Sequence, residues 1–195
     1  LPEWANALQK VRQGAGRLRV KIDQLDSLDF PRRGFALTGT VFNSTPTLGA
    51  DDRYTKWDAD FLAAYSVKEH TLQLGLKAGG PLNGTLPDYD QFSLGGFLQL
   101  SGFKTFQLYG EQLAFGRLVY TYQIQRGALF QGTYLGASLE TGRVSNPVVT
   151  TNPSDWQTGG SVFVAVDTPL GPIYLAYGVA TGGNRSAYLL LGRQQ

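Results

Sequence analysis

The stretch HTLQLGLKAGG, from His70 to Gly80, alternates between apolar and polar residues almost without interruption. Successive side chains of a β-strand point to opposite faces, so Leu72, Leu74 and Leu76 share one face and polar residues occupy the other. The apolar face packs against a second sheet in a soluble sandwich. In an outer-membrane β-barrel it contacts lipid, and the polar face lines the lumen. One strand does not decide between these folds.

The composition excludes several classes of protein. The 195 residues contain 25 glycines, no cysteine and no methionine, and their formal net charge is +2. This charge is too small to indicate a nucleic-acid partner, and the absence of cysteine excludes disulfides and thiolate metal sites. The sequence contains no run of about 18 apolar residues, so it predicts no membrane-spanning helix. No N-terminal export signal is visible, so we expect a mature protein or an excised domain.

A period of two continues through almost the whole chain. It predicts about nine strands, several of them longer than the usual five or six residues. The only helix-like stretch is LPEWANALQKVRQ at the start, where Pro2 lies close to a helix N-terminus. We therefore expect a linker or short helix over 1–15 and an all-β, antiparallel transmembrane barrel over 16–195.

The connections between these strands alternate in length. Short ones lie at 68–69, 126–129 and 169–172, and long ones at 44–53, 81–110 and 144–156. Neighbouring strands of a meander turn at opposite ends, so short turns gather at one rim and long loops at the other. Membrane barrels have short periplasmic turns and long extracellular loops, and aromatic residues gather at their strand ends, as they do here. The pattern favours the barrel over the soluble sandwich.

Four segments resemble one family of such barrels: FPRRGF (30–35), FSLGGFLQLSGF (92–103), VDTPLGPIYLAYG (166–178) and SAYLLLGR (186–193). They are similar to the outer-membrane surface-antigen superfamily, which includes BamA and the two-partner-secretion transporters. The last segment is most like the ending of the patatin-like phospholipase autotransporters of type Vd. The resemblance implies a Gram-negative outer membrane and a barrel of roughly sixteen strands. This chain would correspond to the C-terminal half of such a barrel, or would supply about eight strands per chain.

The same resemblance implies a function. In type Vd proteins the barrel follows a secreted patatin-like lipase domain and a periplasmic POTRA domain, and neither is visible in this sequence. The domain would then anchor or translocate a covalently attached passenger. Its partners would be outer-membrane lipid and the barrel assembly machinery. Two alternatives remain, a soluble β-sandwich or lipocalin-like binding protein, and a passive outer-membrane pore.

The connection over 81–110 is the first candidate site. It is too apolar for an exposed loop, and the family resemblance implies that it folds into the lumen. Its motif residues are Gly95, Gly96, Ser101, Gly102 and Phe103, and we expect the glycines to let its backbone pack against the wall.

Ser101 stands where the family has an arginine that meets acidic residues on late strands. The matching acids are Glu140 and Asp167, which alternation places on the lumen side. We expect Arg117 to be their partner, unless water in the lumen solvates them. On this interpretation, Ser101→Arg would stabilise the barrel.

The end of the chain departs from the family as well. Family members finish with an aromatic residue, whereas this sequence finishes with Gln194 and Gln195. Either Tyr188 and Gly192 carry the assembly signal, or the natural ending lies elsewhere.

The sequence predicts no catalytic residue, metal or cofactor in this domain. His70 is the single histidine, and no G-x-S-x-G motif is present. The aspartates near residue 51 and residue 58 match no calcium loop. A full-length parent protein could still carry a patatin-like phospholipase domain.

The number of strands predicts the oligomeric state. Single-chain bacterial barrels have an even number of strands, and about eight would enclose too narrow a lumen for a long inward loop. Two copies that share one barrel satisfy both conditions, so we expect a homodimer.

Overall fold

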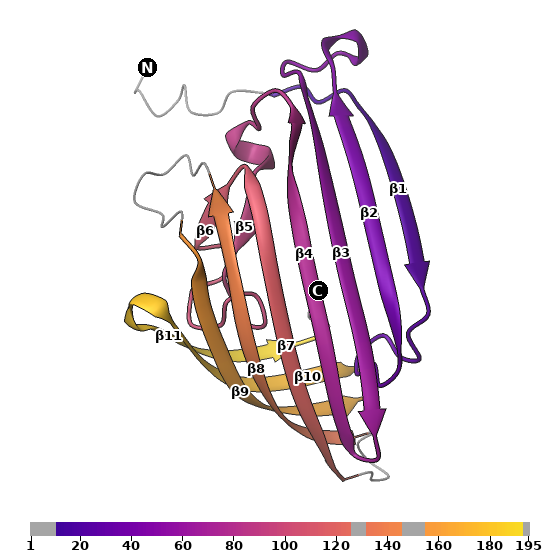
Figure 1. The fold of residues 1–195 in the computed structure, drawn as a ribbon, viewed down its shortest axis with the longest axis vertical. Helices are drawn as coiled ribbons and strands as arrows, with labels where there is room; N and C mark the ends of the chain where they lie inside the picture. Colours follow the sequence, from indigo (N-terminus) through magenta and orange to yellow (C-terminus); the bar gives the residue numbers. More distant parts are fainter. Residues whose placement is uncertain (1–10, 126–131, 146–154, 193–195) are drawn as a thin grey trace.

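The computed structural model describes residues 11–125, 132–145 and 155–192. Nine strands form one antiparallel sheet in which every strand pairs with its neighbours along the chain, and a separate hairpin lies between β4 and β7 (Figure 1). The strands of the main sheet are β1 (Ala15–Asp23), β2 (Gly34–Ser44), β3 (Tyr54–Val67), β4 (His70–Asn83), β7 (Gln112–Gln125), β8 (Gly132–Ser145), β9 (Gln157–Thr168), β10 (Gly171–Ala180) and β11 (Asn184–Leu191). The hairpin consists of β5 (Phe92–Leu94) and β6 (Leu108–Gly110).

Most of these strands are long enough to cross a membrane. A tilted transmembrane strand needs about 9–11 residues, and β3, β4, β7 and β8 have 14 each. We call the rim that carries the short β3–β4 turn (68–69) the short-turn rim. The opposite rim, which carries the long β4–β7 loop (84–111), is the long-loop rim. Two connections depart from the predicted segregation of loop lengths. The β1–β2 connection has ten residues (24–33) at the short-turn rim, and only η4 (Thr181–Gly183) joins β10 to β11 at the long-loop rim.

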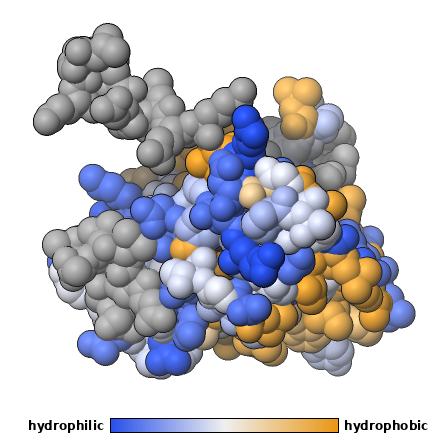
Figure 2. Space-filling model, turned by 90° about the horizontal axis from the view of Figure 1, so that it is seen from above, coloured by the Kyte–Doolittle hydropathy of each residue, from blue (hydrophilic) through white to orange (hydrophobic). Residues whose placement is uncertain are grey.

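The two faces of the sheet differ as the alternation predicts. Leu72, Leu74 and Leu76 are 41–47% exposed on the outer face, whereas Thr71 of the same strand is 5% exposed on the inner face. Seen from above, hydrophobic residues gather along the flank of the molecule and hydrophilic residues gather over its centre (Figure 2). Within the described residues, no second large sheet covers the apolar face. The fold is therefore the curved wall of a membrane barrel rather than a sandwich.

The wall is not closed within the described part of the chain. Among the described residues β1 pairs only with β2 and β11 only with β10, so both outer strands present an unpaired edge. The bounds predicted for the barrel (16–195) and for the inward loop (81–110) differ slightly from the observed ones. The first strand, β1, begins at Ala15, and β4 continues to Asn83. The predicted helix over the first residues lies largely outside the described part of the chain.

No helix in the described ranges has the length and apolar character that crossing a membrane requires.

Candidate functional site

The long β4–β7 loop folds back along the inner face of the sheet. Its hairpin β5–β6 lies behind β7 and β8 (Figure 1). The loop residues Leu94, Leu100, Phe103 and Leu108 form one buried cluster with Phe115 of β7 and Val144 of β8. Burying these side chains removes apolar surface from water and holds the loop against the wall.

A buried polar contact fixes the middle of the loop. The amide N–H of Ser101 donates to Oε2 of Glu140 over 2.6 Å, and its hydroxyl donates to Oε1 over 2.7 Å. Ser138 donates a third hydrogen bond to the same carboxylate. Ser101 is 0% and Glu140 is 4% exposed, so three donors compensate for the loss of water around a buried charge.

Glycines of the wall admit the loop backbone next to this contact. A Cβ on Gly178 of β10 would lie 2.7 Å from Cβ of Ser101 and 2.8 Å from the Gly102 nitrogen. A Cβ on Gly159 of β9 would lie 2.7 Å from the Ser101 carbonyl oxygen. Gly102 itself has φ of 111°, and a Cβ on it would lie 2.6 Å from the Ala180 nitrogen. Only glycine fits such a close approach of loop and wall.

The motif residues Gly95 and Gly96 shape the turn that precedes Ser101. Their φ angles are 120° and 110°, in the region that favours glycine. Leu98 and Leu100 also have positive φ, which costs of order 1–3 kcal/mol for a residue with a side chain. Packing of the loop against the wall therefore imposes this conformation on the backbone.

An aromatic cluster holds the tip of the loop. The ring of Phe97 lies 5.2 Å from that of Phe163, 5.4 Å from that of Tyr174 and 5.8 Å from that of Tyr188. The Tyr188 hydroxyl accepts a hydrogen bond from the Gly102 amide over 3.0 Å and donates one to the Phe103 carbonyl over 2.9 Å. Tyr188, proposed from sequence as part of an assembly signal, thus contacts the loop from the inner face. Gly192 has φ of 96°, and its amide donates to the Pro172 carbonyl over 2.8 Å.

Arg117, the predicted partner of Glu140, lies opposite it on the neighbouring strand and attracts it electrostatically, but its hydrogen bond goes to the loop. It pairs across the sheet with Glu140, yet its Nη1 donates to the Leu98 carbonyl over 3.0 Å, and no salt bridge joins the two side chains in the described part of the chain. Its side chain lies across Gly75, where a Cβ would be 2.8 Å from Nε. The arginine therefore supports the loop through a backbone carbonyl.

Asp167 is remote from this contact, which corrects the expectation of one shared partner. Glu140 pairs with Gly159 of β9, and Asp167 lies eight residues further along the same strand. At a rise of 3.3 Å per residue, the two acids are separated by about 26 Å along the strand. Asp167 is half-buried near the short-turn rim, where it pairs with Pro172.

Sequence reasoning missed the role of the β1–β2 connection. Phe30 of this connection is 8% exposed, and its ring stacks on Tyr134 of β8 at 4.3 Å and lies 5.8 Å from Tyr174 of β10. Arg32 donates to the side chain of Gln123 and to the Lys68 carbonyl. Nothing in the local pattern of the FPRRGF segment indicates contacts with distant strands.

A second group of residues, which the sequence did not indicate, anchors the loop at the long-loop rim. Asp90 accepts a hydrogen bond from the Tyr54 hydroxyl over 2.6 Å and forms a salt bridge with Lys56. Glu111 accepts from the Leu86 amide over 2.9 Å. The start of the loop is thus tied to β3, and its two ends are tied to each other.

The structure places no catalytic chemistry at the single histidine. His70 is exposed on the outer face, and its Nδ1 lies 2.6 Å from the Tyr120 hydroxyl. Among the described residues, no three acidic or histidine side chains gather as metal ligands.

A long-stranded antiparallel wall with an apolar outer face and an inward-folded loop defines an outer-membrane β-barrel. The model of the Omp85 superfamily domain matches residues 4–187, and the chain belongs to this superfamily. The domain is therefore a non-enzymatic barrel of the Gram-negative outer membrane. No curated protein matches the chain in sequence.

The fold is similar to that of BamA from Haemophilus ducreyi lacking POTRA domains 1–3. The TM-score is 0.70 at 14% sequence identity, and the match covers 89% of this chain and 40% of that chain. This chain thus spans less than half of the solved protein that it resembles.

Proposed function

We propose that this chain is part of a barrel that anchors or translocates a covalently attached passenger domain across the outer membrane. The observation that carries the proposal is the inward loop, whose centre is bound to β8 through the contact between Ser101 and Glu140. A loop held along the inner face narrows the lumen, which disfavours a passive pore. Apolar packing and buried polar contacts together hold the loop in this position.

The proposed passenger is a patatin-like lipase. Support comes from the ending SAYLLLGR, which resembles the type Vd autotransporters. Tyr188 within this ending contacts the loop backbone at Gly102 and Phe103. The barrel assembly machinery is the proposed partner during insertion, and Tyr188 and Gly192 remain the proposed assembly signal.

Closure of the wall requires more strands than this chain provides. The unpaired backbone groups of β1 and β11 need partners, because exposed strand edges do not occur in lipid. We propose that a second copy supplies them, with β1 of each protomer paired to β11 of the other, although further strands of a longer polypeptide would satisfy the same edges.

Cysteine cross-linking tests this closure. The chain contains no cysteine, so introduced cysteines on β1 and β11 are its only thiols. Single variants at Val20 and at Ala187, which both lie on the outer face, expressed together in outer membranes, should give a cross-linked species of twice 21.2 kDa. A folded monomer in native mass measurements, with no cross-link at any register tried along these strands, would exclude the homodimer.

Passenger display tests the transport function. In intact cells, the passenger of the full polypeptide should be accessible to added protease. Gly178→Leu, which displaces the loop, should reduce this display, whereas Gly39→Leu should not, because no atom lies within 4 Å of a Cβ on Gly39. Equal display by both variants would contradict a role of the loop in transport.

A further inference from the structure

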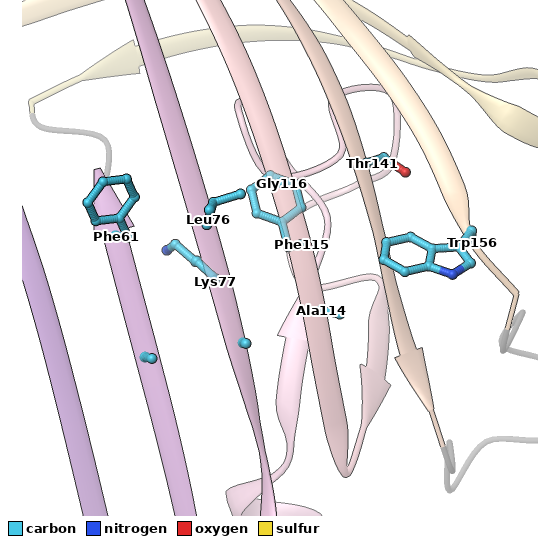
Figure 3. A pocket seen from close by; sticks show the side chains of 10 residues that line it. Phe61, Leu76, Lys77, Ala114, Phe115, Gly116, Thr141 and Trp156 are labelled. Atoms are coloured by element: carbon cyan, nitrogen blue, oxygen red, sulfur yellow. The ribbon is translucent and has the colours of Figure 1, made fainter. Parts of the chain in front are cut away.

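Three recesses that share lining residues lie along the outer face of the wall at β3, β4, β7, β8 and β9, and we refer to them together as the groove. Its first part is an apolar recess of about 420 Å³. Small residues form its floor on neighbouring strands, namely Ala59, Ala78, Ala114 and Gly116. Phe61, Leu76 and Trp156 form its sides, as the close view of this region shows (Figure 3).

The groove continues in both directions along the strands. Toward the short-turn rim, a second apolar recess shares Gly116 and Thr141 with the first and is flanked by Leu74, Leu118 and Leu139. Toward the long-loop rim, Ala114 is shared with a recess of about 290 Å³ whose lining is more polar. The surface thus changes from polar at the rim to apolar deeper along β7 and β8.

The polar recess carries a cation. Arg143 lies on the outer face of β8 directly opposite Ala114 of β7. Its guanidinium carbon is 5.3 Å from the centre of the Trp156 ring, and no carboxylate forms a salt bridge with it in the described part of the chain. Gln112 and Trp57 lie beside it over Gly80, where a Cβ would be 3.6 Å and 3.9 Å from their side chains. The cluster offers a positive charge and polar donors at the depth of lipid headgroups.

We propose that this groove binds one phosphate-bearing acyl lipid of the surrounding leaflet. The phosphate contacts Arg143 and Gln112 between the two indole rings, and one acyl chain lies along the small residues toward Leu74 and Leu139. Charge complementarity selects the headgroup, because the unpaired guanidinium at the membrane surface favours an anion. The small and apolar residues beyond Ala114 suit an acyl chain. The inference rests on the placement of the barrel in the membrane and is independent of the proposed passenger.

Native mass spectrometry of the detergent-purified protein tests this site with added phosphatidylglycerol. The unmodified protein should retain one lipid per chain, and R143Q should lower its retention several-fold. R53Q is the matched control, because Arg53 is exposed at the same rim and lines neither recess. Diacylglycerol with the same acyl chains, which lacks the phosphate, should be retained poorly.

A second pair of variants tests the groove itself. A114L fills the point that the polar and apolar recesses share, and it should abolish retention of the lipid. A137L adds the same bulk to the outer face of β8 outside the recesses and should leave retention unchanged. Retention that is equal in R143Q and the unmodified protein, or equal for diacylglycerol, or unchanged in A114L, would overturn the proposal.

Discussion

Ser101 and Glu140 are 39 residues apart in sequence and meet through two hydrogen bonds, one from the backbone amide and one from the hydroxyl of the serine. One residue of the pair lies in the inward loop and the other in β8. The contact is buried, so protein donors replace most of the water around the carboxylate.

Glu140→Gln should release the middle of the loop. The amide retains the shape of the carboxylate but directs an N–H₂ group at a donor, so at least one buried hydrogen bond is lost. We expect a loss of about 2 kcal/mol in the free energy of unfolding. Denaturant titration in detergent measures this loss, and limited proteolysis should show faster cleavage within 84–111. Ser101→Ala, which keeps the amide contact, should have a smaller effect, and the reverse order would contradict this account.

Gly178→Ala should weaken the packing of the loop against β10. The new methyl group would lie 2.7 Å from Cβ of Ser101, which forces the loop or the strand to move. Overpacking of this kind costs about 1–3 kcal/mol. Thermal unfolding should show a lower Tm than in Gly39→Ala, where the added methyl group meets no atom within 4 Å. Equal Tm values of the two variants would show that the loop accommodates the methyl group without loss of stability.

Ser101→Arg should destabilise the protein, in contrast to the expectation drawn from the family motif. Ser101 is fully buried, and its hydroxyl also accepts a hydrogen bond from the Leu98 amide over 3.0 Å. An arginine would remove these contacts and would have to displace the loop from Gly178. A lower Tm and faster proteolysis of the loop are expected. A higher Tm would show that the guanidinium finds Glu140 without disturbing the wall.

Asp26 should make the β1–β2 connection sensitive to acid. Desolvation raises the pKa of its carboxyl, but hydrogen bonds from the amides of Arg32 and Arg33, at 2.8 and 3.1 Å, outweigh it and lower the pKa below the ordinary value. A lowered pKa in the folded state stabilises the protein above the ordinary carboxyl pKa of about 4. This contribution is lost as the pH falls through the lowered value.

Melting temperatures between pH 7 and pH 3 test this dependence. Asp26→Asn should show a smaller decrease in Tm on acidification than the unmodified protein, while Asp88→Asn, which removes an exposed loop carboxylate, serves for comparison. Identical decreases in the unmodified protein and Asp26→Asn would contradict the contribution of Asp26.

The sequence by itself determined the wall of the barrel. The period of two assigned Leu72, Leu74 and Leu76 to the outer face and Thr71 to the inner face, since strand geometry is local and alternates at every residue. The resemblance of 92–103 also indicated an inward loop, and alternation placed Glu140 on the lumen side.

Only the tertiary structure decided which residues meet inside the barrel. Alternation assigned Glu140 and Asp167 to the same face, but the strand register sets their depth, and it separates them by eight residues along β9. Likewise, Phe30 reaches Tyr134 and Tyr174 because the sheet curves and brings β1–β2 next to β8 and β10. These contacts join residues more than 100 positions apart, so their formation depends on the curvature and register of the whole sheet, which no local pattern specifies.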